Sequence, residues 1–170
     1  ATTNHSTTLR ALGAAEMSPL AQADRQHAFT LLHDALPRIM EEPQNAALRI
    51  DLCAAAFLVN RADDDDQGRR RYRDRTASSA YALATALHIR YAHLWQGEAT
   101  SSVMPTITRL TPPAELGPAA RIAQAVGVWT DGMTAQAAAE ATASALNNFY
   151  QKIGMPTQLR GLGIPQDDLP

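Results

Sequence analysis

Apolar residues recur every three or four positions along most of this 170-residue chain, which is the spacing of helices that bury one face. The first clear run starts after Ser18-Pro19, because serine is a good N-cap and proline suits the first helical position. Pro37 interrupts the run, so we expect the helix to kink or stop there. Its apolar positions are Leu20, Ala23, Ala28, Leu31, Leu32 and Ala35.

The same spacing predicts a second helix over about 45–60. The polar stretch 63–68 contains a glycine and is expected to be a loop. A long helix is predicted over about 69–93, followed by a short element over 101–110 that Pro105 breaks. The apolar face of the second helix consists of Leu48, Leu52, Ala55, Ala56 and Val59.

Two more helices are predicted near the C-terminus. The first spans about 114–126, with a break near Gly117-Pro118. The last spans 135–153, with Thr134 as its N-cap and Gly154 at the position after its C-cap. No segment shows the alternation of a β-strand and no internal repeat is present, so the sequence predicts one all-α domain over 1–170, a multi-helix bundle.

Composition narrows the class of protein. The chain is 45% hydrophobic and its net charge is -2, so it has no general attraction to nucleic acid or to anionic membranes. Neither a bilayer-spanning apolar run nor a signal peptide is present, and we expect a cytoplasmic protein. The single cysteine, Cys53, lies in an apolar run and is expected to be buried and inert. Ala1 is consistent with loss of an initiator methionine, so we expect a complete chain.

Three stretches carry a family resemblance. They are the tail GMPTQLRGLGIPQDDLP from Gly154, the helix SAYALATALHIRYAHLW from Ser79, and the segment WQGEATSSVMP from Trp95. Together with the helices around Ser18 and Pro37, they resemble the C-terminal helical part of the iron-containing alcohol dehydrogenases and maleylacetate reductases.

The resemblance implies a metal-binding helical domain whose usual ligands are missing here. The family holds its divalent metal with an Asp and a His four residues apart and with two later His. In this sequence, the four ligand positions correspond to Thr3, Thr7, Tyr81 and Gln96. The family has a further His, on the same helix as one of the ligands and near the substrate, and that position corresponds to Thr85. A small shift of the alignment brings His5 to either of the first two places. Hydroxyls and an amide are poor ligands for iron or zinc, so we expect no metal.

The nucleotide-binding part of the family is also not recognisable in this sequence. The family binds NAD(P) in an N-terminal α/β domain with a glycine-rich turn, and no G-x-G-x-x-G motif occurs here. We therefore expect no cofactor and no stand-alone dehydrogenase activity.

The candidate site residues are Tyr81, Thr85, Gln96 and His5. They either fill a former metal site as part of the core or line a small-molecule pocket, with Tyr81 as an acid or hydrogen-bond donor. Residues 1–17 are expected to be a flexible segment or one that closes this pocket. Glu98 is expected to cap its turn.

Several other residues have structural explanations. The basic run 69–75 is expected to pair with the aspartates at 63–66 or with a partner chain. We expect His27 and His33 to flank a helix core, and Trp95 and Trp129 to be core or interface anchors. His88 and His93 lie five residues apart, so they do not share a helical face as a metal pair would.

Three functions follow as hypotheses. The first is a repurposed small-molecule protein that is free of metal and NAD, such as an isomerase, cyclase, lyase or hydrolase. The second is an accessory subunit that pairs with a separate nucleotide-binding chain, and the third is a non-catalytic binding scaffold. Because the face that the nucleotide domain covers in the family is uncovered here, we also expect a homo-oligomer or a partner chain.

Overall fold

The computed structural model describes residues 1–14, 16–66 and 75–168. These residues form seven α-helices and two short 3-10 turns, and no strand occurs among them, so the all-α prediction is confirmed. The elements are α1 (Thr2–Ala11), α2 (Pro19–Glu41), α3 (Ala46–Asp66), α4 (Arg75–Arg90), α5 (Gln96–Leu110), α6 (Leu116–Ala125), α7 (Ala135–Lys152), η1 (Leu159–Leu162) and η2 (Gln166–Asp168).

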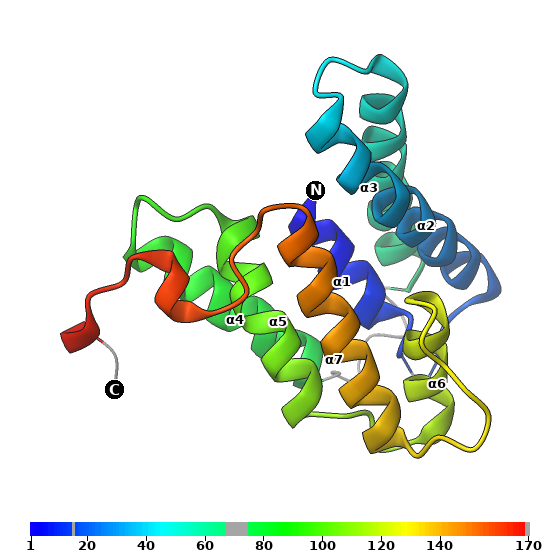
Figure 1. The fold of residues 1–170 in the computed structure, drawn as a ribbon. Coiled ribbons are helices and arrows are strands. Elements are labelled where there is room, and N and C mark those ends of the chain that lie inside the picture. Colours follow the sequence, from blue (N-terminus) through cyan, green and yellow to red (C-terminus); the bar gives the residue numbers. More distant parts are fainter. Residues whose placement is uncertain (15, 67–74, 169–170) are drawn as a thin grey trace.

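The helices form a bundle with a hairpin at one side. Helices α2 and α3 pack against each other as an antiparallel pair, which projects at the upper right of Figure 1. Helix α7 packs on α5 and α6, and α1 fits between α2 and α5. The main core lies among α1, α5 and α7, and its largest fully buried side chains are Tyr150, Leu9, Met104 and Leu146.

Three residues that were predicted to lie at helix ends do so: Ser18, Thr134 and Gly154. The Ser18 and Thr134 side chains accept hydrogen bonds from the backbone N–H groups of Ala21 and Ala137 at 2.9 and 3.1 Å. Gly154 has a φ of +70°, and its N–H donates to the Gln151 carbonyl at 3.0 Å. The Met155 N–H donates to the Tyr150 carbonyl at 2.9 Å. This pair of bonds is the Schellman arrangement that glycine favours.

Helix α1 was not predicted, because its buried face is polar. Thr2, His5, Ser6 and Leu9 are buried at helical spacing, so the pattern of a hydrophobic stripe is missing. The Ser6 hydroxyl donates to the Thr2 carbonyl one turn back at 3.2 Å, which satisfies this hydroxyl inside the fold. The N-terminal segment is therefore part of the bundle.

Pro37, at which a kink or a stop was predicted, does not stop its helix, and Pro105 does not break its element into two. Helix α2 continues past Pro37 to Glu41, and α5 contains Pro105 within a continuous helix. The element predicted over 101–110 in fact begins at Gln96. Each proline removes one backbone donor, but the packing of a long helix outweighs that loss.

The acidic end of α3 is helical, although a loop was predicted for it. Arg61 pairs with Asp24 of α2, and Asp63 lies 3.5 Å from Arg25. The Ser18 hydroxyl also donates to Asp65. These contacts with α2 extend the helix to Asp66, beyond its predicted end.

Other predictions need correction or lie outside the described residues. The predicted helix over 69–93 ends at Arg90, while its start and most of the basic run at 69–75 lie outside the described residues.

Cys53 is exposed, so the prediction of a buried thiol is wrong. Trp129 is partly buried against Ala119 and its neighbours, whereas Trp95 is 75% exposed and is no core residue. None of the described helices has the length and apolar composition needed to cross a bilayer.

Candidate functional site

The helices that carry the candidate residues meet in the structure. Helix α1 contacts both α4 and α5, and α4 packs along α5. The contact is close at Gly97 in the first turn of α5. A Cβ atom at that position would lie 3.4 Å from Thr2 Cβ and 3.6 Å from Met155 Cε. The fold therefore brings together α1, α4 and the start of α5, as the family resemblance implies.

Within this junction the predicted residues differ in accessibility. Tyr81 is 50% exposed, and Gln96, at the first position of α5, is half-buried. Thr85 lies one turn after Tyr81 on the same side of α4, and its hydroxyl is buried without a hydrogen-bond partner among the described residues. The Thr7 hydroxyl donates to the Thr3 carbonyl at 3.0 Å. Convergence of these side chains on one pocket remains a prediction.

His5 belongs to a different, buried cluster. Its Nε2 lies 3.1 Å from Nδ1 of His33, and its Nδ1 lies 3.3 Å from the Tyr150 hydroxyl. The Tyr150 hydroxyl is 2.5 Å from Ser6 Oγ. The His5 ring stacks on Phe149, with ring centres 4.5 Å apart. Of the residues in this cluster, only His5 was predicted from the sequence as a candidate site residue. Its partners His33 and Tyr150 lie 28 and 145 residues away in the sequence, so no local pattern indicates the contact.

Burial keeps this cluster neutral. Desolvation, followed by the nearby His33, lowers the pKa of His5 to about 3. Burial also lowers the pKa of His33 and raises that of the Tyr150 hydroxyl. A neutral imidazole has one donor and one acceptor. Because the Ser6 hydroxyl donates to the Thr2 carbonyl, the Tyr150 hydroxyl donates to Ser6 and accepts from His5, which in turn accepts from His33. The cluster is thus a self-satisfied hydrogen-bond chain that joins α1, α2 and α7.

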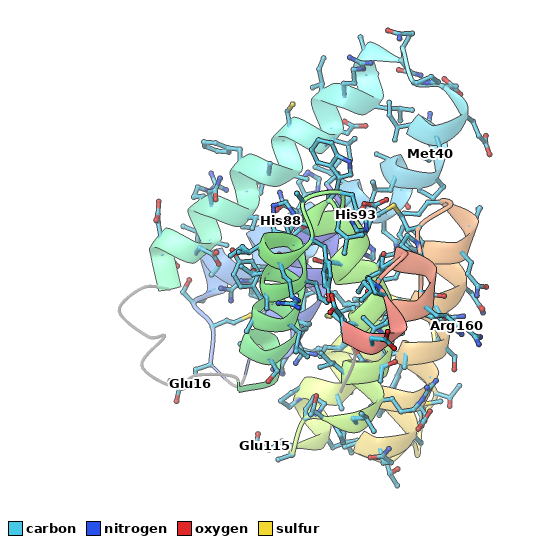
Figure 2. All side chains as sticks on the ribbon, turned by 90° about the vertical axis from the view of Figure 1, so that its left-hand side faces the viewer. Glu16, Met40, His88, His93, Glu115 and Arg160 are labelled. Atoms are coloured by element: carbon cyan, nitrogen blue, oxygen red, sulfur yellow. The ribbon has the colours of Figure 1, made fainter. Side chains whose placement is uncertain are left out.

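The other histidines are held by the backbone or lie on the surface. Nδ1 of His88 lies 2.6 Å from the Leu94 carbonyl, and Nε2 of His93 lies 3.0 Å from the Leu162 carbonyl. Figure 2 shows both side chains near the turn from α4 to α5. The Glu98 carboxylate accepts from the Trp95 N–H at 2.8 Å, as predicted for a capping residue. Among the described residues, no three His, Cys, Asp or Glu side chains are grouped as metal ligands.

Two cavities on the described surface lie elsewhere in the fold, and neither is lined by Tyr81, Thr85 or Gln96. The larger has a volume of about 470 Å³ and lies between the α4–α5 turn and the C-terminal tail, with His93 and Glu98 on its wall. The smaller, of about 240 Å³, lies between α2 and α6. Tyr81, Thr85 and Gln96 therefore do not form either cavity.

The sequence and the fold of this chain are similar to those of known proteins. Residues 10–170 match the Fe-containing alcohol dehydrogenase family, C-terminal. Among solved structures, alcohol dehydrogenase from Oenococcus oeni superposes with a TM-score of 0.77 at 18% identity, over 97% of this chain and 40% of its own. Sulfoacetaldehyde reductase from Bifidobacterium kashiwanohense in complex with NAD+ superposes with a TM-score of 0.68 at 21% identity, over 96% of this chain and 39% of its own.

No curated protein matches the chain significantly. The chain spans about two fifths of the length of the two solved neighbours, and their low identity shows the fold alone. The family match covers nearly all of the chain, from residue 10 to its end. The chain therefore belongs to the Fe-containing alcohol dehydrogenase family, of which it represents the C-terminal helical part.

Proposed function

We propose that this chain binds a small oxygen-containing molecule at the junction of α1, α4 and α5, without metal or NAD. The observation that carries the proposal is the Thr85 hydroxyl, which is buried and lacks a hydrogen-bond partner among the described residues. A buried hydroxyl without a partner costs about 1–3 kcal/mol, and a bound ligand would remove that cost. Any chemistry at this site is of a non-redox kind: isomerisation, cyclisation, elimination or hydrolysis.

The donors at the family's metal positions do not suit a divalent transition metal. Thr3, Thr7, Tyr81 and Gln96 offer neutral hydroxyls and an amide, whereas iron and zinc are held by imidazole and carboxylate groups. The Thr7 hydroxyl is already used within α1. The same neutral groups suit hydrogen bonding to an uncharged substrate.

The hydrogen-bonding groups of Tyr81, Thr85 and Gln96 define what the proposed site can recognise. The half-exposed Tyr81 phenol is able to donate to a carbonyl or hydroxyl oxygen, and Thr85 and Gln96 are able to donate and accept. Of the two solved neighbours, one is an alcohol dehydrogenase and the other a sulfoacetaldehyde reductase. Short alcohols and aldehydes are therefore the class of ligand that we propose.

Paired threonine variants test this proposal. Ethanol and acetaldehyde serve as uncharged probes, with binding followed by protein NMR. We expect Thr85→Val and Tyr81→Phe to weaken binding of a probe at least tenfold without lowering the melting temperature. The control is Thr108→Val, because the Thr108 hydroxyl is also buried and unpartnered among the described residues but lies elsewhere on α5. Equal loss of binding in both threonine variants, or no binding of any probe to the wild type, would refute the proposal.

A second candidate is an accessory subunit that pairs with a nucleotide-binding chain. It is supported by the partial coverage of the solved neighbours and by exposed apolar side chains on α4 and the following turn, Leu83, Ile89 and Trp95. In a Trp129→Phe background, Trp95 fluorescence reports burial of this surface. A blue shift on addition of a purified NAD-binding part of a family member, abolished by Ile89→Asp, would support this candidate. An unchanged spectrum would exclude that partner.

A further inference from the structure

The outer side of α3 carries an apolar stripe that no described element covers. Exposed residues follow one another at steps of four and three: Ala46, Ile50, Cys53 and Phe57. Ile50 is 66% exposed and Phe57 is 64% exposed. The opposite side of the helix, with Leu48, Ala55 and Ala62, is buried against α2 and its surroundings. Figure 1 shows α3 at the edge of the molecule, away from α5 and α7.

The spacing of the stripe indicates what covers it. Alternating steps of three and four are those by which one helix packs along another. The stripe is also symmetric about the midpoint between Cys53 and Ala54. Ile50 and Phe57 both lie three and a half residues from that midpoint, which is about 5 Å along the axis. A twofold axis through it would place Ile50 of one copy against Phe57 of the other.

We propose that α3 is a self-association surface, on which the α3 helix of a second copy of this chain packs antiparallel about the Cys53–Ala54 midpoint. The contact is isologous, because each copy presents the same stripe. Small residues at the centre, Cys53 and Ala54, allow the helices to approach closely. Arg61 lies over the Phe57 ring, 5.9 Å from its centre, and would meet the small Ala46 of the partner.

The size of the stripe indicates a weak dimer. The two large side chains each expose on the order of 100 Å². With the alanines, Cys53 and the stems of the flanking polar residues, each copy buries on the order of 400–500 Å². The total of about 1,000 Å² is at the low end for specific interfaces. We therefore expect a weak dimer whose population rises with protein concentration.

A bilayer is a poor fit for this surface, because the C-terminal end of α3 is acidic from Asp63 to Asp66 and repels anionic lipids. A different protein chain is the remaining alternative to a second copy, and it would leave the purified chain monomeric.

The first test measures mass against concentration for the full chain by sedimentation or light scattering. We expect the dimer to appear as concentration rises, and Phe57→Asp to weaken it at least tenfold. Phe57 is mostly exposed, so this change should leave the helical circular dichroism unaltered. Leu110→Asp is the matched control, because Leu110 is 72% exposed on another helix. A chain that is monomeric at all concentrations, or a Leu110→Asp variant that loses the dimer equally, would overturn the proposal.

The second test fixes the direction of packing with a short bis-maleimide. Cys53 is the only cysteine of the chain, and the proposed axis places the two Cys53 thiols next to each other. We expect covalent dimers from the wild type and none from Cys53→Ser. In a Cys53→Ser/Ala46→Cys variant the two thiols would lie 15 residues apart along the pair, roughly 22 Å, and should not be linked. Linking at both positions, or only at position 46, would show that the proposed antiparallel packing is wrong.

Discussion

The neutral histidine cluster predicts that the protein loses stability in mild acid. His5 is fully buried, and its folded-state pKa is lowered from an ordinary value of 6.5 to about 3. The unfolded chain takes up a proton at this residue below pH 6.5, whereas the folded chain does not. Stability is therefore fully present above pH 6.5 and is lost as pH falls toward 3.

The size of this loss of stability follows from the pH range between 6.5 and 3, over which only the unfolded chain is protonated at His5. Each pH unit below 6.5 costs about 1.4 kcal/mol for one such group. At pH 4.5 the two-unit difference amounts to about 2–3 kcal/mol, and His33, whose pKa is also lowered, adds to it. This loss is a large fraction of the stability of a domain of this size, roughly 5–15 kcal/mol.

The assay compares urea unfolding at pH 7.5 and 4.5. His5→Gln removes the titrating ring and keeps a polar side chain, so the variant is less stable at neutral pH but should lose about 2 kcal/mol less than the wild type on acidification. His27→Gln is the control, because His27 is exposed. Equal losses of unfolding free energy in the wild type and His5→Gln between the two pH values would show that His5 protonation does not cause the acid sensitivity. The same conclusion would follow if His27→Gln changed the pH dependence as much as His5→Gln does.

Three further predictions concern the core, a helix end and the metal. Leu146→Ala should lower the free energy of unfolding by about 2–5 kcal/mol in urea titration, because Leu146 is fully buried in the main core; a loss below about 1 kcal/mol would contradict this packing. Gly154→Ala should cost about 1 kcal/mol of thermal stability, because the residue has a φ of +70° and no neighbour that a methyl group would contact. An unchanged melting temperature would mean that the backbone relaxes there. Elemental analysis after purification without chelators should find much less than one equivalent of iron or zinc, and a full equivalent would show that the chain has rebuilt a metal site.

The sequence determined the helical architecture where local chemistry is decisive. Ser18 and Thr134 cap helices because their hydroxyls satisfy free N–H groups, and Gly154 ends α7 because glycine tolerates a positive φ. The motifs around Trp95 and Gly154 also identified the family correctly, which the match over residues 10–170 confirms.

The tertiary structure decided what local patterns do not carry. Helix α1 forms because Tyr150, 145 residues from His5, provides a polar partner inside the core, and no spacing rule anticipates such a contact. Cys53 is exposed because α3 has only one covered side, so an apolar run in the sequence lies partly on the surface. The acidic end of α3 stays helical because Arg25 of α2 and the N-cap residue Ser18 pair with it. The sequence specifies which residues prefer a helix, whereas their neighbours in space decide how far each helix extends and which of its faces is buried.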